Sequence, residues 1–382
     1  MFLCETDDQF VSLQNPLTKP FLVMDTDCAV AMCPGGYHIV VLDFQGSVWR
    51  SGANHHSQLD NLERGLTKVL SLPPIVSVAA ARFRSYFFDE AGSVWVCGDN
   101  PFFQFGIETQ RGEITIPTRI PNLQNIDKVF TGSDYTFFQD KEGWLWGCGA
   151  VFPLQDEAQE KKLVRNPMKM KKPMPGLKGI AINDTHCLYV DGNGAVWILK
   201  SNRNLDEHFF DNFVLTHNFP KVEMLSFSPS HILFLDENQA VYALGDNSLG
   251  RCGFPFNVYE LTTPTRLENL PPIKQIQTGA SHSVLLDVEG CVWTFGGKGE
   301  GQLGRKKEDT SPNHVPTKIE YLPKIVKIMC GAFSSMAVDE EGIVYACGFP
   351  TRILEFTILQ GFPHLRELER KNMKTKSANK LC

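Results

Sequence analysis

The chain has 382 residues, of which 42% are hydrophobic and 21% charged, and its formal net charge is −6. These fractions are typical of a soluble globular protein, and the acidic balance argues against a body that binds nucleic-acid phosphate. No apolar run approaches the ~20 residues that span a bilayer, and the N-terminus lacks the basic start and apolar core of a signal peptide.

Residues 1–14 form an extension before the first recognisable element. Residues 15–20 resemble proline-led segments that recur later, at 116–120, 263–267 and 315–319. Proline is tolerated at the start of an outer strand, where its missing amide matters least. The later segments each follow a hairpin, whereas no hairpin precedes residues 15–20. We therefore expect this N-terminal strand to join the last hairpin and close a ring, which removes an exposed sheet edge.

A short motif, Asp-x-x-Gly followed by an apolar residue and an aromatic one, recurs seven times. Its acid stands at Asp43, Asp89, Asp140, Asp191, Asp236, Asp287 and Asp339, with spacings of 46, 51, 51, 45, 51 and 52 residues. Only the fifth copy replaces the glycine, with Gln239. Aspartate and glycine at these positions are typical of a type I turn whose carboxylate caps backbone amides. The seven aspartates are therefore predicted to be structural turn caps and not catalytic acids.

The strands on either side of this turn indicate how the hairpins pack. The strand before the turn is apolar on both faces, as in residues 283–286, and the strand after it has adjacent valine and tryptophan side chains on opposite faces. Such strands are buried on both sides. Radially stacked sheets with a repeat of about 50 residues satisfy this condition. The prediction is an all-β, seven-bladed β-propeller over residues 15–363, with the tryptophan column packed between blades.

The connections after the hairpins differ between copies although the hairpins do not. The sixth copy continues through the glycine-rich residues 296–304, whereas the third continues through 149–158, which contains Phe152 and Asp156. Such loops on a rigid scaffold commonly provide variable contact surfaces.

The chain ends in a basic polar tail, residues 364–382, with lysines and arginines at Arg366, Arg370, Lys371, Lys374, Lys376 and Lys380. We interpret it as a solvated tail, and nuclear import or contact with an anionic surface is the alternative.

The eleven cysteines include no Cys-x-x-Cys pair, and three share one repeat column, Cys97, Cys148 and Cys347. We expect buried thiols and neither disulfides nor zinc. Reduced thiols fit a cytoplasmic or nuclear protein.

Residues 279–304 combine the glycine, histidine, hairpin and loop positions of the repeat, at Gly279, His282, Asp287, Gly290, Val292, Trp293, Gly296, Gln302, Leu303 and Gly304. This pattern resembles the regulator of chromosome condensation repeat, over about residues 15–350. Recurring Trp-Asp pairs of the WD40 class and recurring paired glycines of kelch repeats are both absent. The resemblance implies a seven-bladed propeller.

The column five residues before each aspartate holds His38, Arg84, Tyr135, His186, His231, His282 and Ser334. Four histidines in one column suggest a metal site, but adjacent blades would hold them too far apart for metal bonds of about 2 Å. We expect no metal, and we expect each imidazole to form its hydrogen bonds within its own blade.

Founding members of the resembled family catalyse nucleotide exchange on a Ran-type small GTPase. They use acidic residues in the Gly-x-x-His loops of neighbouring blades, with a wedge after the intervening hairpin. In this chain Asp134 and Asp184 lie in two such loops, and residues 149–158 lie where the wedge would fall. In both loops the acid is shifted by one residue from the family's position. Two surface aspartates on turns remain the alternative interpretation.

No sequence pattern of covalent catalysis or of a cofactor site is present. We therefore expect a monomeric protein-interaction propeller that binds a protein partner through its loop face, without nucleic acid. The alternative is a guanine nucleotide exchange factor for a Ran-like small GTPase. The candidate partner-binding residues are Asp134, Asp184, Tyr135, His186, His231, His282, Phe152 and Asp156.

Overall fold

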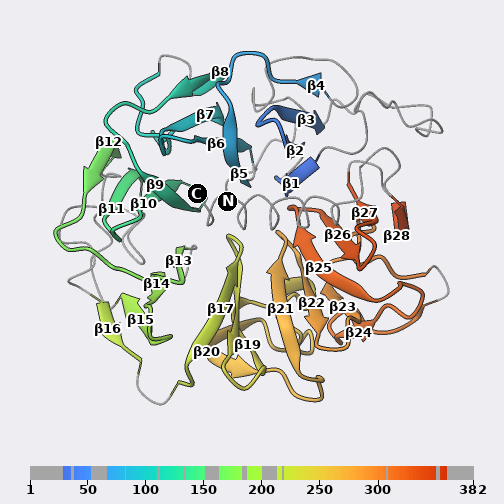
Figure 1. Ribbon diagram of the computed structural model, residues 1–382. Coiled ribbons are helices and arrows are strands. Elements are labelled where there is room, and N and C mark those ends of the chain that lie inside the picture. The colour runs from blue at the N-terminus through green and yellow to red at the C-terminus, as the bar shows by residue number, and fades with distance from the viewer. Residues whose placement is uncertain are drawn as a thin grey trace, which may run out of the picture.

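The computed structural model of the protein describes residues 29–35, 38–52, 67–81, 83–109, 112–132, 134–150, 163–182, 187–199, 213–216, 219–306, 309–349 and 353–358. These residues form seven four-stranded antiparallel sheets that stand side by side in a ring (Figure 1). The predicted all-β, seven-bladed propeller is confirmed. No helix within these ranges is long and apolar enough to cross a membrane.

Each sheet runs outward from the axis of the ring in chain order (Figure 1). The first, innermost strands are β1 (Ala29–Pro34), β5 (Ile75–Ala81), β9 (Ile126–Thr131), β13 (Gly179–Ile182), β17 (Val222–Phe227), β21 (Ile273–Thr278) and β25 (Ile325–Cys330). The second strands are β2 (His38–Asp43), β6 (Arg84–Asp89), β10 (Tyr135–Asp140), β14 (Cys187–Val190), β18 (His231–Asp236), β22 (His282–Asp287) and β26 (Ser334–Asp339).

The outer half of each sheet begins after the Asp-x-x-Gly turn. The third strands are β3 (Val48–Gly52), β7 (Val94–Asp99), β11 (Leu145–Ala150), β15 (Val196–Leu199), β19 (Val241–Asp246), β23 (Val292–Gly296) and β27 (Val344–Gly348). The outermost strands are β4 (Thr67–Lys68), β8 (Glu113–Arg119), β12 (Leu163–Lys169), β16 (Phe213–Leu215), β20 (Glu260–Arg266), β24 (Thr317–Lys318) and β28 (Ile353–Ile358). A short 3₁₀ turn, η2 (Ser248–Gly250), follows β19.

The core lies between neighbouring sheets, which explains why the second strands are apolar on both sides. All six residues of β22 are buried. One cluster joins Leu233 of the fifth sheet to Leu285 and Phe295 of the sixth, and all three side chains are 0% exposed. Each sheet therefore covers the faces of its two neighbours, as the double-sided hydrophobic pattern requires.

The tryptophan column is less deeply placed than the sequence suggests. The indole of Trp293 is half-buried and packs against the cluster between the fifth and sixth sheets, and Trp197 likewise lies beside the cluster that contains Tyr189. The apolar residue that precedes each aromatic one is fully buried instead, as Val292 is. The tryptophans therefore close the outer edge of the core and do not fill its centre.

The last sheet takes its outer strand from a segment that differs from the expected one. Its order is β25-β26-β27-β28, with Tyr345 of β27 opposite Ile358 of β28. A strand that follows its partner closely in the chain closes only a short loop, which favours this pairing over that of a distant segment. Residues 15–20, which we expected at this position, lie outside the described residues, as do residues 1–14 and 364–382.

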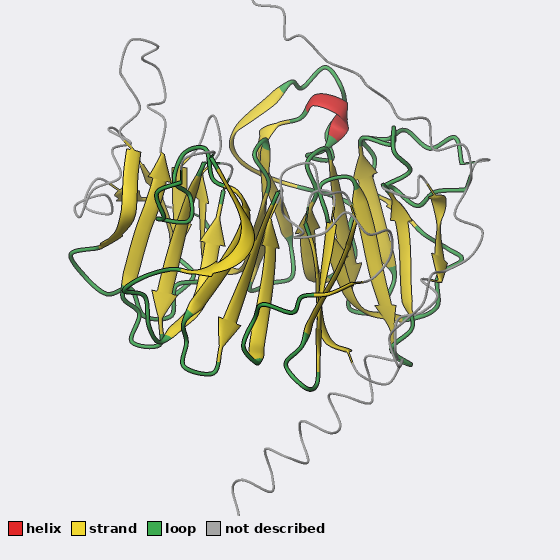
Figure 2. Cartoon of the chain, turned by 90° about the horizontal axis from the view of Figure 1, so that it is seen from above, coloured by secondary structure: helices red, strands yellow, loops and turns green. Residues whose placement is uncertain are grey.

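Alternation of strand direction gives the ring two distinct faces. The turns between first and second strands and the connections from third to outer strands lie on one, which we call the histidine face. The Asp-x-x-Gly turns lie on the other, the aspartate face. Figure 2 shows the ring edge-on, with η2 drawn red above the strand ends on the histidine face. Among the described candidate partner-binding residues, Asp134, Tyr135, His231 and His282 belong to the histidine face.

Candidate functional site

On the histidine face, the inner turns of the second, third, fifth, sixth and seventh sheets are each joined to the start of the outer connection of the same sheet. The amide of Ala150 donates to the carbonyl of Asp134 at 2.7 Å, and the amide of Gly297 donates to that of Ser281 at 2.7 Å. Backbone hydrogen bonds of this kind fix where each variable connection begins. The loops therefore start from rigid, repeated positions.

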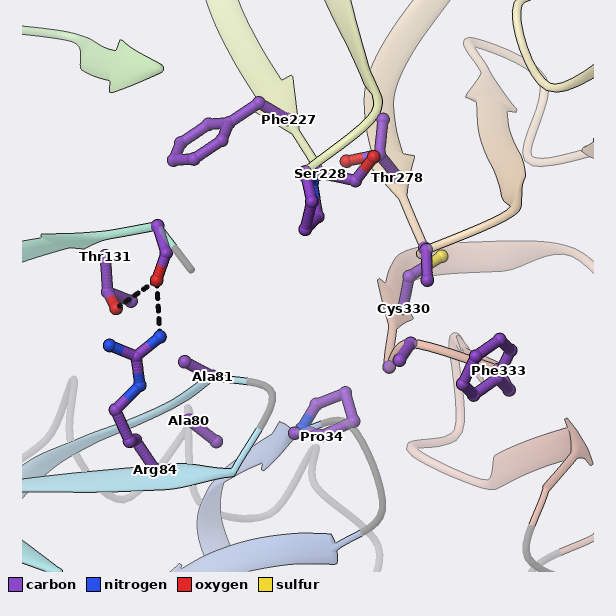
Figure 3. A pocket seen from close by; sticks show the side chains of 17 residues that line it. Pro34, Ala80, Ala81, Arg84, Thr131, Phe227, Ser228, Thr278, Cys330 and Phe333 are labelled. Carbon is purple, nitrogen blue, oxygen red and sulfur yellow. Dashed lines mark hydrogen bonds between the residues drawn. The ribbon is translucent and has the colours of Figure 1, made fainter. Parts of the chain in front are cut away.

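At the centre of the histidine face the inner turns surround a cavity of about 330 Å³. Its wall is mostly small or apolar, with Pro34, Ala81, Phe227, Cys330 and Phe333 among the lining residues (Figure 3). Arg84 contributes a cation to the wall and donates a hydrogen bond to the carbonyl of Gly132 on the next sheet. The cavity lies where the inner turns of six sheets converge at the axis of the ring.

The rim of this cavity is tied together across sheets by backbone hydrogen bonds. The amide of Ala280 donates to the carbonyl of Ala332 at 2.8 Å, and the amide of Ala332 donates to that of Gly35 at 3.3 Å. The sixth, seventh and first sheets thus share one hydrogen-bonded edge. Such links hold the turns of these three sheets in fixed relative positions.

The buried histidines connect neighbouring sheets, contrary to our expectation of bonds only within each blade. Their Nε2 atoms lie 2.9 Å, 2.8 Å and 2.9 Å from serine Oγ atoms of the following sheet, in the pairs His38–Ser85, His231–Ser283 and His282–Ser335. The histidine begins the second strand and points sideways into the next blade. Of these three histidines, only His231 also has a side-chain partner in its own turn, where its Nδ1 lies 2.9 Å from Ser228 Oγ.

The glycine of Gly-x-x-His gives room for the imidazole. A β-carbon on Gly279 would lie 2.1 Å from Cε1 of His282, and one on Gly35 would lie 2.3 Å from Cε1 of His38. Distances this short exclude a side chain while the ring stays in place. A histidine at this position therefore requires the glycine three residues before it.

These histidines are neutral in the folded protein. Burial, with a smaller contribution from the Arg50 guanidinium, lowers the pKa of His38 to about 4. Burial also lowers the pKa of His282 to about 3. It is again the main reason why the pKa of His231 lies well below its ordinary value, with Arg251 and His282 adding to the effect.

Burial separates the candidate partner-binding residues into two groups. His231 and His282 are 0% exposed and Tyr135 is 2% exposed, so their side chains lie beneath the surface and hold the turns in shape. Asp134 is partly exposed at the start of β10. Asp184, His186, Phe152 and Asp156 lie outside the described residues. Of the predicted contacts that the structure describes, Asp134 is the one with a side chain that reaches the surface.

On the aspartate face, the seven acids accept hydrogen bonds from the turns that follow them. In the sixth copy, Oδ1 of Asp287 accepts from the amides of Glu289 at 3.0 Å and Cys291 at 2.8 Å. Its Oδ2 accepts from the indole Nε1 of Trp293 at 2.9 Å. The same indole bond forms at Asp43, Asp89 and Asp191, and the Tyr345 hydroxyl donates to Asp339. The acid thus holds both the turn and the aromatic residue six positions later.

Replacing Asp287 by alanine is expected to lower the free energy of unfolding by about 3 kcal/mol, because three donors lose a buried charged acceptor at once. Replacement of the exposed neighbour Glu289 by alanine should change it by less than about 0.5 kcal/mol. Urea unfolding of the two variants and the wild type measures both values. Equal midpoints for the two variants would contradict the role that the hydrogen bonds assign to Asp287.

Within the described ranges, no three His, Cys, Asp or Glu side chains come together as metal ligands would. His38, His231 and His282 each face a different seam between sheets. The aspartates are engaged by their own turns.

The serine partners of the histidines were not predicted, although the sequence contains a signal for them. Ser85, Ser283 and Ser335 stand four residues before an Asp anchor, and the preceding copy has histidine in each case. His186 is followed at that position by Ile232, which has no polar group. Pairing one copy's histidine column with the next copy's serine column would have revealed the link.

The ring of seven sheets built from one repeated hairpin defines the class of the protein, a repeat-built seven-bladed β-propeller. The family model "Regulator of chromosome condensation (RCC1) repeat" matches residues 238–286 and 289–338. These two matches, with the hairpin repeated in all seven sheets, support the resemblance to the regulator of chromosome condensation repeat.

Relatives resemble the chain over most of its length. "Guanine nucleotide exchange factor SRM1" of Saccharomyces cerevisiae is 25% identical over 404 residues, covering 88% of this chain and 73% of that protein. "Regulator of chromosome condensation" of Xenopus laevis is 26% identical over 348 residues, covering 88% and 74%. The crystal structure of human WBSCR16 superposes with a TM-score of 0.51 at 18% identity, covering 90% of this chain and 82% of that one. This structural likeness supports the fold.

Proposed function

We propose that the protein is a protein-binding propeller whose histidine face contacts the partner. The observation that carries this proposal is a set of backbone hydrogen bonds that joins the inner turns of the sixth, seventh and first sheets to one another, and the inner turns of five sheets to their outer connections. A rigid platform that presents sequence-variable loops is the arrangement by which many scaffolds bind other proteins. Its preorganisation keeps the entropy lost on binding small.

The second candidate is a guanine nucleotide exchange factor for a Ran-like small GTPase. It is favoured by the similarity, over 88% of the chain, to a protein named as a guanine nucleotide exchange factor. Exchange requires no covalent chemistry, because a surface that binds the nucleotide-free GTPase more tightly than the loaded one expels the nucleotide by differential affinity. Asp134 and Asp184, in the Gly-x-x-His loops of neighbouring repeat copies, would contact the GTPase, with residues 149–158 between them in the chain.

Release of a fluorescent guanine nucleotide from a Ran-type GTPase tests this candidate. We expect wild-type protein to accelerate release and the combined Asp134→Ala and Asp184→Ala variant to lose about tenfold or more of that acceleration, as when contacts at the centre of an interface are removed. Titration calorimetry against the nucleotide-free GTPase measures binding separately. Binding without acceleration would support the protein-binding proposal and remove the exchange activity.

Glu142 provides the matched control for these substitutions. It is an exposed acid of the third sheet, as Asp134 is an acid of that sheet, but it lies in the Asp-x-x-Gly turn on the aspartate face. Glu142→Ala should leave release and binding unchanged. If Glu142→Ala impaired both as strongly as the double variant, the histidine face would not be the contact surface.

We place this activity in the cytoplasm or nucleus. The described cysteines are all free, and five of them are buried. Free thiols are typical of reducing compartments.

A further inference from the structure

An exposed apolar surface lies on the histidine face between the fifth and sixth sheets. It is formed by four residues, Leu249, Phe256, Tyr259 and Val315, which are 55%, 52%, 78% and 42% exposed, and which we call the apolar ledge. His314 connects its two halves, because its ring centroid lies 4.8 Å from that of Phe256. Clustered exposed apolar side chains of this kind commonly mark interaction sites.

The loop that carries the ledge is held rigidly by one buried side chain. Asn247 is 1% exposed, and its Nδ2 donates to the carbonyls of Phe254 at 3.0 Å and Val258 at 2.7 Å. Its Oδ1 accepts from the amide of Cys252 at 3.1 Å. The loop stands above the strand ends near η2 (Figure 2). The aromatic residues are therefore presented in one conformation, which lowers the entropy lost on contact.

Leu249 has an energetically unfavourable backbone conformation. Its φ is +63°, in the left-handed region, whereas Phe102 and Glu300, at the same position of the second and sixth connections, do not have positive φ. This conformation is unfavourable by about 1 kcal/mol for a residue with a β-carbon. The side chain of Leu249 is exposed to solvent in this conformation. Such an outlier is explained if the side chain is covered by another molecule.

Charges of opposite sign border the ledge on its two sides. Asp246 of β19 and Glu260 of β20 are paired neighbours on the fifth sheet. Lys298 lies on the sixth-sheet side, where a β-carbon on the preceding Gly297 would come within 3.2 Å of Leu249 Cδ1. Asp246 lies 3.6 Å from Arg251, but among the described residues no ion pair involves Glu260 or Lys298. A two-fold axis through the ledge would place the basic side of one copy opposite the acidic side of another.

We propose that two copies of the chain associate through the apolar ledge about such a two-fold axis. Leu249, Phe256 and Tyr259 of one copy pack against the same residues of the second, and Lys298 faces Glu260 across each end. The contact involves far fewer residues than the roughly 20–30 per partner of a standard stable interface. The dimer is therefore weak and forms as the protein concentration rises, which departs from the monomer expected from the sequence.

Sedimentation equilibrium of the full chain over a concentration series tests the proposal. The mass should rise from the 42.9 kDa of one chain toward twice that value. Tyr259→Ser should raise the dissociation constant by about tenfold or more, as expected for an interfacial aromatic. Ile116→Ser is the matched control, because Ile116 is 61% exposed on β8, away from the ledge, and should not change it.

Charge exchange tests the two-fold arrangement itself. Lys298→Glu and Glu260→Lys should each weaken association, and their combination in one chain should restore it, because the opposed charges are then reversed together. A wild-type chain that stays at the mass of one copy throughout the series would overturn the proposal. So would a dimer that is unaffected by Tyr259→Ser, or one that the combined charge exchange fails to restore.

Discussion

Replacement of Gly98 by alanine is expected to destabilise the propeller by about 4 kcal/mol. Gly98 closes β7 with a φ of +113°, and a β-carbon there would lie 2.1 Å from the carbonyl oxygen of Phe83. That carbonyl is fixed, since it accepts the amide of Asp99 at 3.0 Å. The variant therefore combines a strained backbone conformation with overpacking against a backbone atom, each of which is unfavourable by about 1–3 kcal/mol.

Urea unfolding followed by tryptophan fluorescence measures this loss, and Gly299→Ala provides the control. Gly299 has no positive φ, and no atom lies within 4 Å of the place where its β-carbon would stand. Its replacement should shift the free energy of unfolding by no more than about 0.5 kcal/mol. Similar midpoints for the two variants would show that the closing glycine of the hairpin is not sterically required.

The hairpins could be predicted because their signals are local and repeated. Asp287 and Gly290 specify a turn through their own backbone preferences, and the apolar pattern around them specifies burial on both sides. Seven copies of the same signal leave little freedom in the choice of architecture. The family resemblance of residues 279–304 then follows from the same positions.

Features that depend on contacts between copies could not be found in this way. The period does not say which side chain of the next sheet His282 meets, so its bond to Ser335 was missed. The depth of Trp293 was also overestimated, because a strand with two apolar neighbours does not reveal which one faces the centre of the core. The outer strand β28 lacks the proline that β8, β12 and β20 contain.

The candidate site was predictable in part. The resemblance points to the inner turns, and the structure places Asp134 at the surface of that face. The resemblance does not distinguish surface residues from buried ones. His231, His282 and Tyr135 begin second strands whose side chains are buried. The ledge was missed because Leu249, Phe256 and Tyr259 lie in a connection without repeat periodicity, where exposure depends on the loop's own hydrogen bonds.

The protein is expected to lose stability steeply as the pH falls from 7 to 5. The unfolded chain binds a proton at each histidine near pH 6.5, whereas burial holds the pKa of folded His38 at about 4 and that of folded His282 at about 3. The unfolded state therefore binds more protons over this range, and stability decreases as the pH falls. One pKa unit corresponds to about 1.4 kcal/mol, so each of these two histidines removes about 2 kcal/mol by pH 5. His231, whose folded pKa is also lowered, adds to the loss.

Urea unfolding of wild type and His282→Gln at pH 7 and pH 5 isolates this contribution. The glutamine amide can donate to Ser335 Oγ at either pH but cannot take up a proton, so the loss between the two pH values should be about 2 kcal/mol smaller than in wild type. Adding His38→Gln should reduce the loss by about the same amount again, because the two histidines lie at separate seams of the ring. An unchanged pH dependence in both variants would mean that these imidazoles are not held neutral by the packing of neighbouring blades, and that the inter-sheet bond to serine survives protonation.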